Sequence, residues 1–424
     1  MKNRVVITGL GVVAPNGVGL DAFEHAVKNG ISGIRHFEEL ERLKFSCQIA
    51  GMPDISNELA LHYFTELELK NFNATGILYG VIAGMDAWKD AGLSMEILDD
   101  PDWDSGTIFG AGTSGIEKFR ESIYKIDDFK TRNLGSTSVI QTMNSGISAY
   151  LAGKLGLGNQ VTTNSSACTT GAESIIMAYD RIKSGQAKRI LAGSTSDSGP
   201  YIWGGFDAMR VCTFKHNDSP ETGSRPMSAS ASGFVPASGA GALVLENLET
   251  ALARGARIYA EVLGGALNSG GQRGLGSLTA PNPVAVQRCV QKAMENAGIT
   301  GQDVDSINGH LTATTKDSLE ISNWSKALNR SGADFPYINS LKSTVGHCLS
   351  AAGSIESVAT VLQLHGGFVF PNRNCEDLHP DITDIIDSSR IPQEMLEKDL
   401  KVVLKASFGF GDVNGCVVFK KYEN

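Results

Sequence analysis

The order of apolar and polar residues along the chain predicts strands that alternate with helices. Short apolar runs of strand length lie at residues 3–8, 105–109, 189–192, 241–245, 259–264, 337–339, 401–405 and 415–419. Apolar positions spaced three to four residues apart predict helices at 20–29, 75–91, 171–184, 284–297, 318–328 and 351–364. This alternation favours largely mixed α/β sheets.

Two stretches of the chain share one local pattern, in which a short strand and a run of small residues lead into a helix rich in Ala, Gly and Ser. The first spans 161–174 and contains Cys168, and the second spans 337–354 and contains His347. Helices with so few large side chains can approach another backbone closely at the centre of a molecule. We therefore expect two related halves, divided near residue 250.

Composition and charge narrow the class of protein. The 424 residues are 42% apolar and include 48 glycines, as in a globular protein with many tight backbone approaches. The net charge of -9, without a Lys/Arg-rich run, argues against nucleic-acid binding. The start of the chain mimics a signal peptide but has no cleavage motif, and no apolar run has bilayer length, so we expect a cytoplasmic protein that has no membrane partner. Seven scattered cysteines without a CxxC pair favour reduced thiols, and neither a disulfide framework nor a metal site is expected.

Three positions could carry chemistry. Cys168 lies at a predicted helix start, where the partial positive charge of the helix lowers the pKa of a thiol. His310 and His347 lie in loops at strand ends, where reactive groups gather. Considered alone, each of the three residues is also compatible with a purely structural role in the core. The glycine-rich turn at 406–415 could direct backbone N–H groups at an oxyanion.

Four motifs in order resemble the β-ketoacyl-(acyl carrier protein) synthases of the elongating Cys-His-His type. They are Ser-Ala-Cys168-Thr-Thr-Gly, His310-x-Thr-x-Thr, Lys342-x4-His347 and Ser-Phe-Gly-Phe410-Gly, and the similarity covers nearly the whole chain. The resemblance implies a thiolase-like α/β fold, in which two related βαβαβ halves form five α-β-α-β-α layers. Residues 1–250 would carry the nucleophilic cysteine, and residues 251–424 would carry the two histidines.

The resemblance also implies the reaction. The chain would be an acyltransferase that condenses an enzyme-bound acyl group with malonyl-acyl carrier protein, with loss of carbon dioxide, in fatty-acid or type II polyketide synthesis, polyene pathways included. Cys168 would hold the acyl group as a thioester, and His310 and His347 would bind the malonyl thioester and stabilise its enolate. The N–H groups of Cys168 and Phe410 would form the oxyanion hole, and Phe410 would be the gate for the second substrate.

Supporting residues follow from the same resemblance. Lys342 and Glu320 would support and orient the two histidines. The pantetheine arm would contact Thr312 and Thr314, and the acyl channel would pass Thr113 and Phe206 toward the other subunit of a dimer. Arg210 and Lys70 would dock the acyl carrier protein. No cofactor is expected, because the carrier protein brings its own phosphopantetheine, and the dimer partner would be a second copy or a chain-length-factor-like subunit.

The sequence departs from the family pattern at three places. Leu311 replaces a glycine after the first histidine, which weakens the assignment of Glu320. Asp412 replaces a glycine after Gly-Phe-Gly, which puts the mobility of the gate in doubt. Serines and alanines replace several acidic residues in 225–239, so we expect neutral packing where the family has an ion-pair network.

Three other functions compete with this interpretation. The segment Gly9-Leu-Gly11-Val-Val-Ala14 fits a loose dinucleotide fingerprint and suggests an NAD-dependent enzyme, although Pro15 opposes the helix that such a site needs. A thiolase would need a second catalytic cysteine near the C-terminus, for which Cys416 is the candidate. A non-catalytic chain-length-factor-like subunit typically lacks the nucleophile, which is present here as Cys168.

Overall fold

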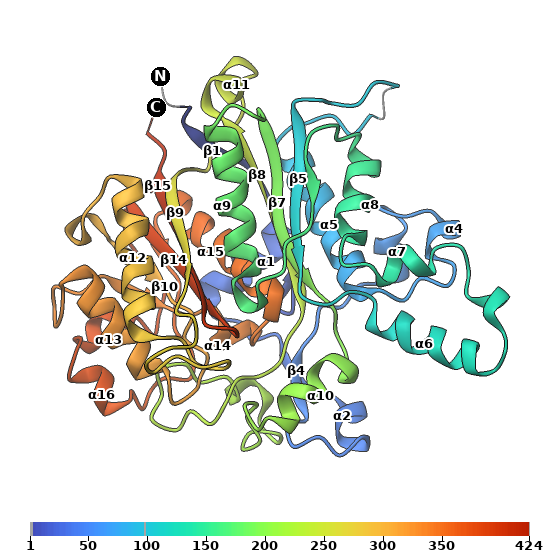
Figure 1. Cartoon of the computed structure of the whole chain (residues 1–424). Coiled ribbons are helices and arrows are strands. Elements are labelled where there is room, and N and C mark those ends of the chain that lie inside the picture. The colour runs from blue at the N-terminus through green and yellow to red at the C-terminus, as the bar shows by residue number, and fades with distance from the viewer. Residues whose placement is uncertain (1–2, 97–98, 424) are drawn as a thin grey trace.

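A sheet of eleven strands runs through the centre of the protein (Figure 1). The computed structural model describes residues 3–96 and 99–423. In the first half the strands are β1 (Val5–Ala14), β5 (Ser105–Ala111), β6 (Val161–Thr162), β7 (Arg189–Ser196) and β8 (Gly239–Asn247), and β2 (Gly17–Val18) pairs beside β1. In the second half they are β9 (Ala260–Ser269), β10 (Ser306–Asn308), β11 (Tyr337–Asn339), β14 (Val402–Gly409) and β15 (Val413–Lys421).

The two halves repeat one strand order. The first half reads β6-β5-β7-β8-β1 across the sheet, and the second half reads β11-β10-β14-β15-β9. In both halves the first two pairings are parallel and the last two are antiparallel. An antiparallel pairing of β1 with β9 joins the halves. The structure therefore contains two halves with the same strand order.

Helices cover both faces of the two half-sheets and make five layers. The outer helices of the first half are α5 (Thr75–Asp90) and α8 (Gly146–Leu155), and those of the second half are α12 (Pro283–Ala297) and α13 (Asp317–Leu328). The central layer contains α1 (Leu20–Asn29), α9 (Thr170–Lys183) and α15 (Ala352–Gly366). Figure 1 shows α9 and α15 between the two sets of strands. The thiolase-like five-layered fold is confirmed.

The remaining elements are short or lie at the periphery. The other α-helices are α2 (Glu38–Arg42), α3 (Asn57–Ala60), α4 (Glu66–Leu69), α6 (Ile116–Asp127), α7 (Ser138–Thr142), α10 (Pro200–Ala208), α11 (Leu248–Ala253), α14 (Lys342–Val345) and α16 (Pro380–Thr383). Two small hairpins pair β3 (Ile34–His36) with β4 (Ile49–Gly51) and β12 (Phe368–Val369) with β13 (Leu396–Glu397). Among the described residues, no helix combines the length and the apolar character that a membrane crossing requires.

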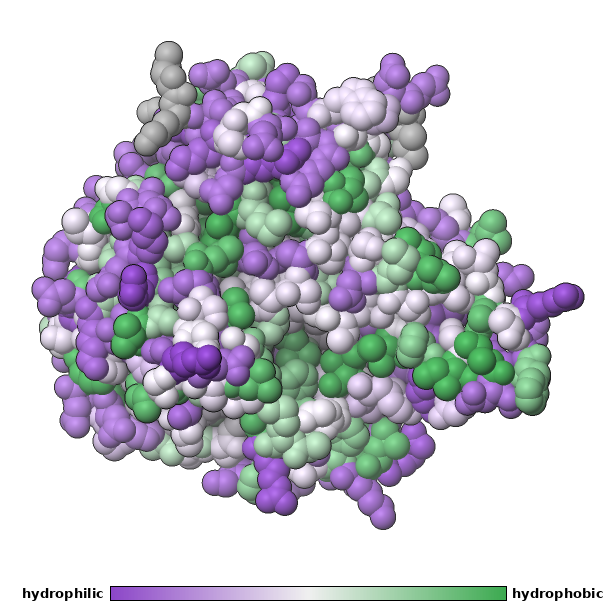
Figure 2. All heavy atoms as spheres, in the orientation of Figure 1, coloured by the Kyte–Doolittle hydropathy of each residue, from purple (hydrophilic) through white to green (hydrophobic). Residues whose placement is uncertain are grey.

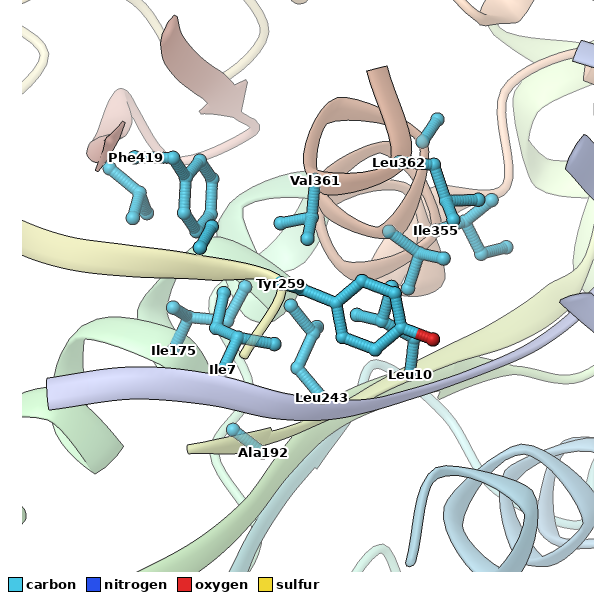
Figure 3. Close-up of a cluster of buried hydrophobic side chains, with 14 of the residues drawn as sticks. Ile7, Leu10, Ile175, Ala192, Leu243, Tyr259, Ile355, Val361, Leu362 and Phe419 are labelled. Carbon is cyan, nitrogen blue, oxygen red and sulfur yellow. The ribbon is translucent and has the colours of Figure 1, made fainter. Parts of the chain in front are cut away.

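The largest core cluster lies between the sheet and α15. In Figure 3, Ile7 and Leu10 of β1 and Leu243 of β8 face Ile355 and Val361 of α15. All five side chains are fully buried. Burial of each one stabilises the fold by roughly 2 kcal/mol relative to its exposure to water. This packing fixes the height of α15 above β1 and β8.

Small residues bring the two central helices into backbone contact. A Cβ added at Gly171 of α9 would lie 2.3 Å from the Ser354 nitrogen of α15, and one added at Gly353 would lie 2.7 Å from the Ala172 nitrogen. The hydroxyl of Ser354 also shares a hydrogen bond of 2.7 Å with the hydroxyl of Ser194 in β7. The predicted close approach of the two small-residue helices is therefore present.

Candidate active site

Cys168 lies where the chain turns from β6 into α9. It occupies a single 3-10 turn, Ala167–Thr169, that directly precedes α9. The hydroxyl of Thr170 accepts the Ser166 N–H at 2.9 Å and donates to the Ala167 carbonyl at 2.7 Å, which holds the turn. A Cβ at Gly409 would lie 3.1 Å from the Cys168 nitrogen, so the glycine lets β14 approach Cys168 closely.

Glu320 and Asp317 of α13 hold the loop that carries His310. This loop follows β10, and the carboxylate of Glu320 accepts the His310 N–H at 2.7 Å and the Leu311 N–H at 2.8 Å. Asp317 accepts the N–H groups of Thr312 at 3.0 Å and Ala313 at 3.1 Å. Glu320 therefore orients His310 through the backbone, in spite of the change to Leu311.

Hydrogen bonds hold His347 at its backbone and at one ring nitrogen. It follows α14 and Gly346, and its N–H donates to the Val235 carbonyl at 2.7 Å. The Nδ1 atom accepts the Leu349 N–H at 3.1 Å. Because Nδ1 is an acceptor, the proton of the neutral ring is on Nε2, which becomes a hydrogen-bond donor.

Cys168, His310 and His347 meet in one pocket. One ligand atom from each, the sulfur or a ring nitrogen, lies within 4.8 Å of the others. The two imidazole rings are 5.3 Å apart in an edge-to-face arrangement. The three residues line a cavity of about 270 Å³ together with Phe408, Phe410, Thr312, Thr314, Thr279 and others. The structure thus brings together residues from both halves of the chain.

The sequence-based expectation of a lowered thiol pKa is not met. Burial raises the pKa of Cys168 to about 11, while the charge of Lys342 and the N–H groups of Phe410 and Cys168 oppose this rise. The helix start favours the thiolate, but the loss of water around the sulfur has the larger effect. The raised pKa keeps Cys168 as a thiol at neutral pH.

Both histidines are neutral. Burial lowers the pKa of His310 and of His347 well below the usual value, and the positive charges of Lys342 and Lys405 lower it further. Nδ1 of His310 is buried and has no hydrogen-bond partner among the described residues. Neutral imidazoles can donate to a developing negative charge without holding a permanent charge in the apolar pocket.

A buried group of three charges, the Lys342–Glu356–Lys405 triad, lies beside the histidines. Nζ of Lys342 donates to Oε1 of Glu356 at 2.5 Å, and Nζ of Lys405 lies 2.8 Å from Oε2. Lys342 therefore lies next to the histidines and forms an ion pair with Glu356. Glu356 and Lys405 were not predicted from the sequence, although a charged residue within an apolar segment is a detectable signal.

Phe410 lies at the pocket with Phe206 behind it. The ring centroids of Phe206 and Phe410 are 6.1 Å apart, and those of Phe206 and Phe234 are 5.7 Å apart. The Phe410 N–H faces the sulfur of Cys168. This placement suits the predicted roles of Phe410 in the oxyanion hole and at the entrance, which stay predictions.

Asp412 fastens the turn of Phe410 to the loop at 270–282. Its buried carboxylate accepts the Asn282 N–H at 2.7 Å and the Gln272 N–H at 3.0 Å. A Cβ at Gly270 or Gly276 would lie 2.1 or 2.4 Å from this carboxylate, so both positions need glycine. Thr279 to Pro281 of the same loop line the pocket. Asp412, which replaces the glycine of the family pattern, therefore connects two walls of the pocket, the turn of Phe410 and the loop at 270–282.

We expect Asp412→Ala to loosen this loop, because two N–H groups lose a charged acceptor. The free energy of unfolding should fall by about 2 kcal/mol, and amide hydrogen exchange should rise at 270–282. Asp412→Asn is the matched control, because it keeps one acceptor oxygen and tolerates the φ of 62° at this position. Unchanged exchange in Asp412→Ala would show that other contacts hold the loop.

The other predicted site residues lie at different distances from this pocket. Thr312 and Thr314 line it, and their hydroxyls are 3.2 Å apart. Thr113 is exposed and is not among the residues that line the pocket. Arg210 is exposed next to Val211, which lines the pocket, whereas Lys70 is exposed at the end of α4. Figure 1 shows α4 and α10 well apart, so Lys70 and Arg210 belong to different surfaces.

The expected neutral packing around 225–239 is wrong. Arg225 pairs with Glu376 at 2.5 Å and with Asp377 at 3.0 Å. Ser228 and Ser230 donate to Asp377 from the side chain and the backbone, at 2.5 and 3.0 Å. The ion pairs persist because acidic residues from a distant segment supply the carboxylates.

Two of the competing functions do not fit these positions. The glycines at 9 and 11 lie inside the buried strand β1, and the next helix begins only at Leu20, so these glycines do not form the strand-to-helix turn that holds a pyrophosphate. Cys416 is fully buried in β15 within the outer core of the second half, away from the residues that line the pocket. A thiolase-like second cysteine is therefore not in place.

Comparison with known proteins decides the family. Residues 2–251 match the model of the beta-ketoacyl synthase N-terminal domain, and residues 259–376 match the model of the C-terminal domain. The chain belongs to the β-ketoacyl synthase family. It is 33% identical to the chloroplastic 3-oxoacyl-[acyl-carrier-protein] synthase I of Arabidopsis thaliana, over 100% of this chain and 87% of that protein. It is 32% identical to 3-oxoacyl-[acyl-carrier-protein] synthase 2 of Vibrio harveyi, over 99% of both chains.

Solved structures show the same fold over the full length of this β-ketoacyl synthase. A beta-ketoacyl synthase from Burkholderia phymatum has a TM-score of 0.88 and 28% identity, over 99% of this chain and 100% of that one. A ketosynthase solved with its type II polyketide acyl carrier protein has a TM-score of 0.87 and 28% identity, over 100% of both chains. The ishigamide ketosynthase/chain length factor has a TM-score of 0.87 and 26% identity, also over 100% of both chains.

Proposed function

We propose that Cys168, His310 and His347 of this β-ketoacyl synthase catalyse the decarboxylative condensation of an acyl group with malonyl-acyl carrier protein. The observation that supports the proposal most is the meeting of one thiol and two neutral imidazoles within 4.8 Å in one pocket. A nucleophile and two hydrogen-bond donors are the groups that acyl transfer and enolate formation require.

In the first step the acyl group moves from its carrier to Cys168. The sulfur forms a new thioester bond, the carrier thioester breaks, and the thiol proton leaves with the carrier thiol. The N–H groups of Cys168 and Phe410 face the sulfur, where they can stabilise the oxyanion of the tetrahedral intermediate. The charge of Lys342 opposes the rise of the Cys168 pKa and so favours attack.

In the second step malonyl-acyl carrier protein loses carbon dioxide and leaves an enolate. Nε2 of His347 carries a proton, because Nδ1 accepts the Leu349 N–H, and it can donate to the thioester oxygen. His310 supplies the second donor. The enolate carbon then attacks the Cys168 thioester, the β-ketoacyl group remains on the carrier, and the thiol regains its proton.

We propose the acyl carrier protein as partner and a two-chain assembly. The pantetheine arm would enter past Thr312 and Thr314, with Arg210 beside the entrance, and no bound cofactor is needed. Figure 2 shows apolar side chains over the projection that contains α6 and α7, where Phe119, Ile123, Tyr124, Phe129 and Val139 are exposed. The end strand β6 has an open edge among the described residues. A second copy or a chain-length-factor-like subunit would cover this region and, with it, Thr113.

We also propose that the protein works in the cytoplasm, which the seven unpaired cysteines support. Thr113 has a small side chain, and an acyl channel that passes it would accept medium or long chains. Identification of the acyl groups that the enzyme extends would show whether it serves fatty-acid or polyketide synthesis.

The wild-type chain, purified alone, provides the test. With acyl-acyl carrier protein it should gain the mass of one acyl group on the peptide that contains Cys168. Addition of malonyl-acyl carrier protein should release carbon dioxide and yield β-ketoacyl-acyl carrier protein. A folded chain that shows neither the acyl mass nor carbon dioxide release would instead be a non-catalytic, chain-length-factor-like subunit.

A further inference from the structure

The Lys342–Glu356–Lys405 triad carries one more positive charge than its carboxylate can balance. The side chain of Glu356 is 2% exposed, and those of Lys342 and Lys405 are 1% and 0% exposed. Lysines are almost never fully buried unless they are paired. One lysine would neutralise Glu356, so the second leaves an excess charge in the interior.

The ammonium of Lys405 has one ion-pair partner and two hydrogen-bond acceptors. It donates to the Ala406 carbonyl and to the Ser407 hydroxyl at 3.2 Å. It also lies 2.8 Å from Oε2 of Glu356, an ion pair that lacks hydrogen-bond geometry. Burying a charge costs free energy even when it is well paired, so a second buried lysine is not explained by stability.

Lys405 lies directly beside the loop of His310. In the parallel pairing of β10 with β14, Lys405 is opposite Asn308, two residues before His310. Three residues after Lys405 on the same strand, the ring of Phe408 is 6.0 Å from the ring of His310. The triad therefore borders the two histidines on the side of β14 and α15.

We propose that Lys405 is a positioning residue of the condensing site: it holds one oxygen of Glu356 so that the other stays on Lys342, and it gives the triad one excess positive charge beside the histidines. This charge opposes protonation of His310 and His347 and attracts the negative charge of the enolate. Lys405 thus acts on the decarboxylation step through its field and through Glu356, without touching the substrate.

The electrostatic surroundings of the histidines agree with this role. The charged and titratable groups that face them are Cys168 beside α9, Asp317 and Glu320 of α13, Lys342 of α14, Glu356 of α15 and Lys405 of β14. After burial, the positive charges of Lys342 and Lys405 lower the pKa of His310 and of His347. Removal of one positive charge should therefore raise the pKa of both rings.

A series of variants with different triad charge tests the proposal. Lys405→Met removes the charge at similar length and reduces the net triad charge from one to zero, while Glu356 keeps Lys342 as its partner. The double variant Lys405→Met with Glu356→Gln restores a net charge of one. Carbon dioxide release from malonyl-pantetheine, a probe that needs no carrier docking, is measured between pH 5 and 8 for each folded variant.

Decarboxylation needs neutral histidines, so its rate falls as the pH drops through their pKa. In Lys405→Met this fall should occur at a pH higher by about one unit, as expected for a unit charge several ångströms away. The double variant should return the fall toward the wild-type pH. A residue that only fills space would change the rate and the melting temperature without moving the pH of the fall.

Two results would overturn the proposal. One is a fall at the wild-type pH in Lys405→Met, and the other is a shift in Lys405→Met that the double variant does not reverse. If Lys405→Met does not fold, proton NMR titration of the wild-type histidine rings decides instead. Both rings should stay neutral at pH 6, and protonation of either near pH 6.5 would contradict the role of the excess charge.

Discussion

We expect Cys168→Ala to lose acyl loading and condensation by about 10⁴-fold or more, because the variant has no nucleophile to form the thioester. The fold should survive, since alanine fits the tight turn that precedes α9, and the free energy of unfolding should change by less than about 2 kcal/mol. Mass spectrometry of the intact chain after incubation with acyl-acyl carrier protein measures the loading.

Cys348→Ala is the matched control for this experiment. Cys348 is also buried, follows His347 directly, and has a pKa raised by burial, but it is not among the residues that line the pocket. Its alanine variant should load acyl groups normally. Full condensation by Cys168→Ala, or loss of loading only in Cys348→Ala, would show that the nucleophile has been assigned to the wrong cysteine.

Replacement of either His310 or His347 by alanine should reduce decarboxylation about 10²- to 10³-fold, because each removes one donor to the developing enolate oxygen. Acylation of Cys168 should survive at least in part, since the N–H groups of Cys168 and Phe410 remain. Release of labelled carbon dioxide and the mass of the acylated chain separate the two steps.

His365→Ala serves as the control for the histidine variants. His365 packs on Tyr259 at a ring distance of 4.9 Å and is not part of the pocket, so both steps should proceed at the wild-type rate. His347→Gln, which retains an N–H donor, should recover part of the lost decarboxylation. If the alanine variants lost acylation and kept decarboxylation, the two assigned roles would have to be exchanged.

Much of the fold could be predicted from the sequence, because burial of apolar residues leaves a periodic trace. The predicted helix 20–29 matches α1, and the predicted 284–297 begins one residue after the start of α12. Strand ends were less accurate, because β1 extends to Ala14 whereas the predicted strand ends at residue 8. The helices α6 and α7 were not predicted, although Ile116, Phe119, Ile123 and Ile126 of α6 have helical spacing. In the structure the last three of these side chains are exposed and do not face the core.

The site was predictable where a short motif carries the reactive atom. Cys168, His310 and His347 come together as expected, since each lies at a strand or helix end that the fold directs to one pocket. The pKa of Cys168 was not predictable, because burial outweighs the helix start and can be seen only in three dimensions. Glu356 and Lys405 stand out in the sequence as charges within apolar segments, but their pairing with Lys342 joins α14, α15 and β14 and can be seen only in three dimensions.

The backbone contact between Gly171 and Ser354 limits how this enzyme can be recombined. The first helix directly follows Cys168 and the second follows His347, so the spacing between Cys168 and His347 depends on two chain segments that almost touch. A hybrid that joins the first half of this chain to the second half of a relative would need a close-fitting partner helix opposite Gly171. Engineers who exchange halves to alter substrate range should therefore keep the two central helices from the same parent.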